Sequence, residues 1–138
     1  GLHMALGAKL ARPEAPVYCL VGDGGFAHVW SELETARRHD LNVVVSVLSN
    51  SHLGFQKHAE EVRYGAHTDA VEIAPIDHAA IARACGLYGE RIERPEDYLP
   101  AVEAAFAADR TTVLDVVVDP DAYPPITGFE SRGARQRS

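Results

Sequence analysis

The stretch VYCLVGDGGF, residues 17–26, decides the fold class, because it joins a short apolar run to a glycine-rich turn. A helix is expected directly after it, since apolar side chains recur at helical intervals from Ala27 to His39. The next run, NVVVSVL at residues 42–48, is almost entirely apolar and β-branched, which is typical of a strand covered on both faces. Strand, helix and strand at this spacing predict a right-handed crossover and a parallel sheet.

The rest of the chain continues the alternation. Apolar spacing predicts helices at residues 1–11, 77–86 (with Asp77 as N-cap) and 95–108, and a closing strand at 111–118. Two segments stand apart: Lys57 to Pro75 has no clear period, and the segment from Asp119 is rich in proline. We therefore expect an α/β domain over residues 1–118, with a parallel sheet flanked by helices. Residues 119–138 are expected to form a C-terminal tail and a candidate active-site lid.

Composition excludes several classes of function. The chain has 138 residues, 46% of them hydrophobic, which suffices for one domain with a single core. Its net charge of −7 argues against nucleic acid as a partner, because phosphate binding needs a basic face. No apolar run approaches the roughly 20 residues of a membrane span. Cys19 and Cys85 are isolated from each other and lie in apolar surroundings, which favours reduced core residues in a cytoplasmic protein.

The glycine-rich turn is where chemistry is expected. Gly22, Asp23, Gly24 and Gly25 follow the first strand and precede a helix, and ligands of such sheets bind outside the carboxyl ends of the strands. Glycines admit a ligand close to the backbone, and free N–H groups at a helix start favour anions. An aspartate repels a bare phosphate, however. The turn therefore favours a divalent cation between carboxylate and phosphate, and Mg²⁺ commonly bridges these two groups.

A second oxygen ligand is expected at the end of the neighbouring strand. Asn50 lies there, 27 residues after Asp23, a separation that returns the chain to the same edge of the sheet. Each feature alone has an ordinary interpretation: an aspartate at a helix start is more often a cap, and an asparagine after a strand is more often a turn residue. Their order, position and separation together predict a metal–diphosphate site.

These residues carry a family resemblance. Gly22-Asp23-Gly24, followed by 25 residues and Asn50, resembles the binding motif for thiamine diphosphate (ThDP) in ThDP-dependent decarboxylases and carboligases. GLHMALGAKLARPEAPVYCLVGDGGF is similar to the start of the cofactor-binding segment in the acetolactate synthase group, and WSELETARRHDLNVVVSVLSNSHLGF resembles the next part of that segment. VVDPDAYPPI resembles the end of such chains. The resemblance covers nearly the whole sequence and implies the diphosphate-binding (PP) module of a ThDP enzyme.

The resemblance assigns roles to particular residues. It implies that Mg²⁺ binds the side-chain oxygens of Asp23 and Asn50 and the backbone carbonyl of His52. The family often has Asn-Asn where this chain has Ser49-Asn50, but the ligand position is the second of the pair. The implied cofactor-binding set is Gly22, Asp23, Gly24, Gly25, Asn50, His52, Leu53 and Gly54, with backbone N–H groups holding the diphosphate. Phe55, Gln56 and His58 border the active site in the family and are candidates for substrate contact.

The resemblance also implies a larger protein. Family members carry a Gly-x-Met-Gly-like turn before the position of Gly1, a preceding first strand, and a separate pyrimidine-binding domain whose glutamate drives cofactor activation. We therefore expect an N-terminally truncated module, and the catalytic residues stay unassigned. The expected partners are a pyrimidine-binding domain, on the same longer chain or on another subunit, and further copies in a homo- or hetero-oligomer.

The leading expectation is an acetolactate synthase-like carboligase or decarboxylase that uses ThDP and Mg²⁺ on pyruvate or a related 2-keto acid. One alternative is another ThDP reaction, benzaldehyde lyase-like or oxalyl-CoA decarboxylase-like. A second is a non-catalytic module that keeps the fold and binds cofactor or partner. A Rossmann nucleotide-binding domain is disfavoured, because GDGG lacks the G-x-G-x-x-G spacing and no acidic residue follows the second strand.

Overall fold

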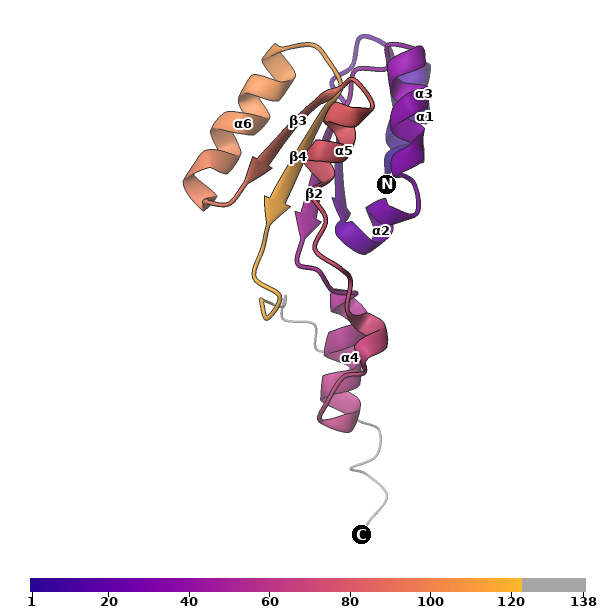
Figure 1. Cartoon of the computed structure of the whole chain (residues 1–138). Coiled ribbons are helices and arrows are strands. Elements are labelled where there is room, and N and C mark those ends of the chain that lie inside the picture. Colours follow the sequence, from indigo (N-terminus) through magenta and orange to yellow (C-terminus); the bar gives the residue numbers. More distant parts are fainter. Residues whose placement is uncertain (123–138) are drawn as a thin grey trace.

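A four-stranded, all-parallel sheet forms the centre of the chain, as the sequence predicts (Figure 1). The computed structural model describes residues 1–122. The strands lie in the order β1-β2-β4-β3. Their bounds are β1 (Tyr18–Gly22), β2 (Val44–Ser49), β3 (Tyr88–Ile92) and β4 (Thr112–Val117).

Helices cover both faces of this sheet. One face packs against α1 (Leu2–Ala11), α3 (Leu33–Arg38) and α5 (His78–Ala84), and the other packs against α6 (Pro95–Ala107). Alternate residues of β2 serve the two sides: Val45 and Val47 belong to the larger core, whereas Val44 belongs to the core under α6. Burial on both faces explains why this strand is almost uninterruptedly apolar.

Two helices lie at the carboxyl edge of the sheet. The short α2 (Asp23–Ala27) follows β1 directly, and α4 (Gly54–Tyr64) projects beyond the strand ends (Figure 1). A 3₁₀ turn at Asp69–Val71 lies against α4. The polypeptide thus leaves the sheet after β2, forms this projecting unit, and returns through α5.

Gly89 allows α5 to lie directly on β3. A Cβ atom at this position would overlap the backbone of Ala79, and its carbonyl oxygen most severely. The carbonyl oxygen of Gly89 also accepts a hydrogen bond of 2.8 Å from Nη1 of Arg83. A side chain at residue 89 would therefore force the helix away from the sheet.

Several sequence predictions need correction. The single helix predicted from Ala27 to His39 is broken: α2 ends at Ala27, a 3₁₀ turn spans Trp30–Glu32, and α3 begins at Leu33. Strand β3 was not predicted, because YGERI is short and carries two charged residues. The segment from Lys57 to Pro75 was expected to lack regular structure, yet it contains most of α4.

The predicted tail and lid, residues 119–138, falls outside the described residues except for 119–122. These four residues follow β4, and the backbone N–H of Val118 donates to the carbonyl oxygen of Ser49 just before them. None of the helices within residues 1–122 has the length and apolar character needed to cross a bilayer.

Candidate functional site

Parallel pairing brings the two predicted ligand positions to one edge of the sheet. Gly22, the last residue of β1, pairs with Leu48 of β2, so the residues after each strand emerge side by side. Asp23 opens α2 on one side, and the Asn50 loop (residues 50–53) leads into α4 on the other. This is the edge at which open α/β sheets bind ligands.

Asp23 joins the two strand ends directly. Its carboxylate is 4% exposed and accepts three backbone hydrogen bonds. Oδ1 accepts from the N–H of Gly24 at 2.8 Å, while Oδ2 accepts from the N–H groups of Asn50 at 3.1 Å and Ser51 at 2.7 Å. A carboxylate offers about four lone-pair positions. Capacity for a cation therefore remains after these three bonds.

The side chain of Asn50 is fixed within its own loop. Its Oδ1 accepts a hydrogen bond of 3.0 Å from the backbone N–H of His52, which identifies this end of the amide as the oxygen. The Nδ1 of His52 donates in turn to the carbonyl oxygen of Asn50 at 2.8 Å. The imidazole of His52 thus points back to the loop backbone.

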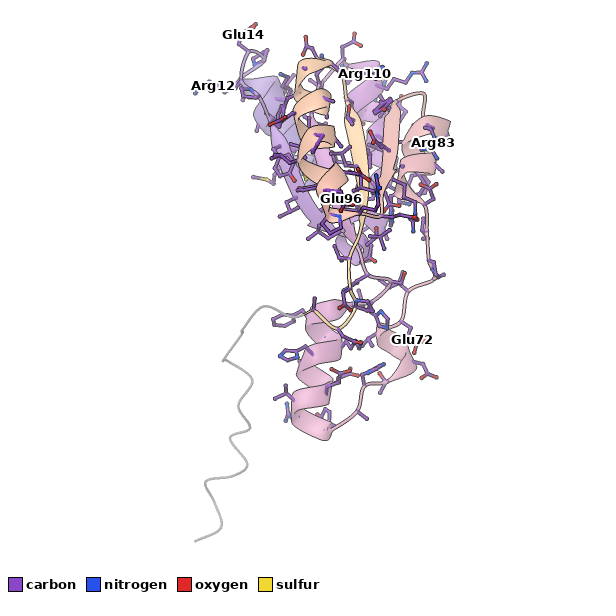
Figure 2. All side chains as sticks on the ribbon, turned by 90° about the vertical axis from the view of Figure 1, so that its left-hand side faces the viewer. Arg12, Glu14, Glu72, Arg83, Glu96 and Arg110 are labelled. Atoms are coloured by element: carbon purple, nitrogen blue, oxygen red, sulfur yellow. The ribbon has the colours of Figure 1, made fainter. Side chains whose placement is uncertain are left out.

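A second segment, residues 71–73, forms hydrogen bonds with the Asn50 loop. The N–H of Leu53 donates to the carbonyl oxygen of Val71 at 2.7 Å, and the N–H of Ile73 donates to that of Ser51 at 2.8 Å. Figure 2 shows Glu72 of this segment beside the start of α4, at the opposite end of the molecule from Arg110. Ser51 itself has φ of 59°, a left-handed conformation that is uncommon for a residue other than glycine.

Glycine at position 24 allows close packing at the site. A Cβ on Gly24 would lie 2.6 Å from Cδ2 of Leu53, so a side chain at residue 24 would require the partly exposed Leu53 side chain to shift. A Cβ on Gly54 would lie 3.0 Å from Nδ2 of Asn50. By contrast, no atom lies within 4 Å of the corresponding position at Gly22, and the space there is open.

The donor set fits Mg²⁺ bound together with a phosphate group. The available ligands are one carboxylate, one amide oxygen and backbone carbonyls, all of them the hard oxygen donors that Mg²⁺ prefers. Within residues 1–122 no group of three or more His, Cys, Asp and Glu side chains could hold a metal ion. One carboxylate is a weak site by itself, so a metal ion at this position would depend on oxygens supplied by the ligand.

Comparison with known proteins decides the family. The family model "Thiamine pyrophosphate enzyme, C-terminal TPP binding domain" matches residues 1–116; thiamine pyrophosphate (TPP) is another name for ThDP. The chain belongs to the thiamine pyrophosphate enzymes. The TPP-binding domain is 39% identical over 126 residues to the acetolactate synthase large subunit IlvG of Mycobacterium tuberculosis (strain ATCC 25618 / H37Rv), covering 90% of this chain and 23% of the relative.

Other relatives have different names. The TPP-binding domain is 34% identical over 116 residues to sulfoacetaldehyde acetyltransferase of Castellaniella defragrans, covering 81% of this chain and 19% of the relative. Among solved structures, a thiamine diphosphate-dependent 4-hydroxybenzoylformate decarboxylase of Rhodococcus jostii RHA1 superposes with a TM-score of 0.81 at 29% identity. That match covers 86% of this chain and 23% of the decarboxylase chain. The chain therefore spans less than a quarter of the length of these relatives.

The predicted substrate residues lie on the first turns of α4 in the TPP-binding domain. Phe55 is 66% exposed, and Gln56 donates to Oε1 of Glu60 at 2.9 Å. His58 follows on the same helix. The structure thus places all three next to the Asn50 loop in sequence, but on a helix that projects beyond the sheet rather than in the contacts around Asp23.

Lys57, a residue that sequence reasoning missed, anchors α4. Its side chain is buried, and its ammonium donates to Oδ1 of Asp121 at 2.7 Å and to the carbonyl oxygen of Pro120 at 3.4 Å. The hydrogen bond from Lys57 and its charge lower the pKa of Asp121. Helix α4 is thereby tied to the segment that comes after β4.

A buried carboxylate lies beneath the Asn50 loop and was also missed. Asp115 of β4 is fully buried and accepts hydrogen bonds from Ser49 Oγ at 2.5 Å and Arg91 Nη1 at 2.6 Å. His78 contributes its backbone N–H and its Nδ1, both 3.3 Å from the carboxylate. Burial by itself raises the pKa of Asp115, but the hydrogen bonds from His78 and Ser49 and the charges of His78 and Arg91 outweigh it. The pKa therefore lies below the usual range.

A cavity of about 220 Å³ opens on the side of the loop that faces β3 and β4. It is lined by Ser49, Asn50, Ser51, Pro75, Ile76, Arg91, Val117, Val118 and Pro120. The wall thus includes Ser49 and Arg91, two of the side chains that donate to Asp115, and the predicted ligand Asn50.

Proposed function

We propose that this TPP-binding domain holds the diphosphate of ThDP through Mg²⁺ in an acetolactate synthase-like decarboxylase or carboligase. The substrate in this proposal is pyruvate or a related 2-keto acid. The observation that carries the proposal is the buried carboxylate of Asp23, which hydrogen-bonds the backbone of Asn50 and Ser51 and so unites the two candidate ligand positions. Mg²⁺ would complete its coordination with diphosphate oxygens.

Each residue of the candidate site would have a definite role. Asp23 and Asn50 would bind the metal through side-chain oxygens, and His52 through its backbone carbonyl. The backbone N–H groups of Gly25 and Gly54 would hold the diphosphate, and the open space beside Gly22 leaves room for its approach. Gly24 and Leu53 would lie beside the diphosphate without donating to it, because their N–H groups already bond Asp23 and Val71. ThDP supplies a nucleophilic carbon and an electron sink when bound. The contribution of this chain would be to position the cofactor relative to the substrate, which lowers the activation barrier because the reactants are already oriented.

The substrate class rests on the relatives. Identity to the acetolactate synthase large subunit IlvG supports pyruvate or a related 2-keto acid. The names of two other relatives, an acetyltransferase and a 4-hydroxybenzoylformate decarboxylase, favour a different ThDP reaction on the same scaffold as the second candidate. A benzaldehyde lyase-like or oxalyl-CoA decarboxylase-like activity belongs to that candidate. Phe55, Gln56 and His58 would contact the substrate from α4.

The proposal includes partners. Since the chain spans 23% of the length of IlvG, a pyrimidine-binding domain would be supplied by the same longer polypeptide or by another subunit, within a homo- or hetero-oligomer. Residues 119–138 would cover the cofactor as a lid. The two cysteines are free, which supports a reducing compartment and hence the cytoplasm.

Calorimetric titration of ThDP, followed by activity assays, tests the proposal. We expect heat of binding with Mg²⁺ present and none with EDTA. The protein carrying both domains should consume pyruvate in a ThDP- and Mg²⁺-dependent reaction. Binding without turnover on any 2-keto acid would instead favour the non-catalytic module. Absence of binding under every condition would refute the cofactor site.

A further inference from the structure

The buried carboxylate of Asp115 lies directly behind the Asn50 loop. We propose that Asp115, acting through Ser49, is a positioning residue that sets the place of Asn50 for metal binding. This inference rests on the proposed function, since it assigns a task to groups around the proposed Mg²⁺ site. Neither Asp115 nor Ser49 binds the metal in this proposal.

Strand register explains why the two residues meet. Val47 of β2 pairs with Asp115 of β4, so Ser49, two residues further along β2, projects from the same face and reaches the carboxylate diagonally. The Ser49 hydroxyl donates to Oδ1 of Asp115 at 2.5 Å. Ser49 is the last residue of β2, and the proposed ligand Asn50 comes next. The hydroxyl therefore fixes the point from which the loop departs.

The loop is thus held from two directions by two buried carboxylates. Asp115 holds Ser49 from the side of β4, and Asp23 holds the N–H groups of Asn50 and Ser51 from the side of β1. If the bond between Ser49 and Asp115 is lost, the loop keeps its backbone hydrogen bonds to Asp23, Ile73 and Val118 but loses its side-chain anchor on the side of β4. We expect this loss to matter for a metal ligand, because small displacements of a ligand weaken coordination.

Asp115 can act as a fixed support because it is itself immobilised. Arg91 of β3 donates to Oδ2 at 2.6 Å, and the backbone N–H of His78, the first residue of α5, approaches the same oxygen at 3.3 Å. Three elements other than β4 therefore converge on one carboxylate: β2, β3 and α5. A buried charge whose donors come from several elements has a single favourable position.

Ser49→Ala tests this role, with Ser46→Ala as its matched control. Both serines lie on β2, and Ser46 is fully buried and accepts a bond from Tyr98 on the opposite face of the sheet. In the metal-free protein we expect hydrogen exchange at the N–H groups of Asn50 and Ser51 to become about tenfold faster in Ser49→Ala and to stay unchanged in Ser46→Ala. Ser49→Thr keeps the hydroxyl and should restore the slow exchange.

The second measurement is Mg²⁺ affinity, by calorimetry at saturating ThDP. Residues that orient a metal ligand typically contribute about 10–100-fold in affinity. We expect a Kd for Mg²⁺ about tenfold weaker in Ser49→Ala, a shift in the same direction in Asp115→Asn, and wild-type affinity in Ser49→Thr and Ser46→Ala.

The outcomes separate this inference from the proposed function. If the wild-type protein binds Mg²⁺ and ThDP but Ser49→Ala behaves like Ser46→Ala in both measurements, the positioning role is overturned and the proposed function stands. If the wild-type protein shows no Mg²⁺-dependent binding, the proposed function fails and the role falls with it. Faster exchange without any change in Kd would also overturn the role, since Ser49 would then support only the loop.

Discussion

Replacing Asp23 with alanine removes more than a metal ligand. The sequence alone predicts that Asp23→Ala abolishes Mg²⁺-dependent cofactor binding and leaves the fold intact. The structure shows that the carboxylate also accepts the N–H groups of Asn50 and Ser51. Each donor left without a partner costs about 1–3 kcal/mol, with the lower end applying where water can reach it. These two donors are half-buried, and the third donor, the N–H of Gly24, is buried, so we expect the metal-free chain to lose about 3–5 kcal/mol of unfolding free energy.

The assay has two readouts and one control variant. Urea unfolding in EDTA gives the free energy of unfolding without metal, and calorimetry with Mg²⁺ and ThDP gives cofactor binding. Asp97→Ala is the control, because Asp97 also lies in the first turn of a helix but is partly exposed and pairs with the neighbouring Arg94. We expect this control to lose less than about 1 kcal/mol and to bind cofactor normally.

Either of two results would contradict this dual role of Asp23. An unfolding free energy for Asp23→Ala within about 0.5 kcal/mol of wild type would mean that the carboxylate does not hold the two strand ends together. Undiminished Mg²⁺-dependent binding of ThDP by a folded Asp23→Ala protein would mean that the metal binds elsewhere.

Three further predictions concern single residues. Asn50→Ala should weaken Mg²⁺ affinity in calorimetry less than Asp23→Ala does, because a neutral ligand is lost rather than a charge; an equal or larger loss would contradict this ranking. Gly89→Ala should destabilise the chain by about 3 kcal/mol in urea unfolding because α5 lies against β3 there, whereas Gly7→Ala, on an open face of α1, should be neutral or stabilising. The lowered pKa of Asp115 stabilises the fold wherever the group is charged in both states, and this stability is lost as the pH falls from about 4 through the folded-state pKa. Urea midpoints measured from about pH 6 to about pH 3 should fall less steeply in Asp115→Asn than in wild type, and parallel curves would count against the assignment.

The centre of the fold could be predicted because its signals are local. An apolar, β-branched run such as residues 42–48 has one stable environment, a strand buried on both faces. Parallel pairing then brings Asp23 and Asn50 together, as the separation in sequence indicates. The sequence could place the two candidate ligand positions side by side because they follow neighbouring parallel strands.

The remaining features depend on contacts between distant segments. Strand β3 has a Gly and two charged residues, and it forms because β4 and α5 receive it. Helix α4 packs little of its surface on the sheet, and its anchor, Lys57, bonds to residues more than 60 positions away. The burial of Asp115 could have been predicted from the sequence, because it is a lone carboxylate within the apolar run TTVLDVVV. Such a group requires several hydrogen-bond donors once it is buried. Which donors these are depends on the register of three strands.

Mg²⁺ and the diphosphate of ThDP are proposed to bind where β1 and β2 end. Mn²⁺ accepts similar oxygen ligands and broadens the NMR signals of nearby groups, so it locates the metal directly. With ThDP present, small additions of Mn²⁺ should broaden the backbone amide signals of Asp23, Asn50 and Ser51 first and leave Arg110, at the opposite edge of the sheet, sharp. Broadening centred on any other part of the chain, or equal broadening with and without ThDP, would contradict this position of the metal.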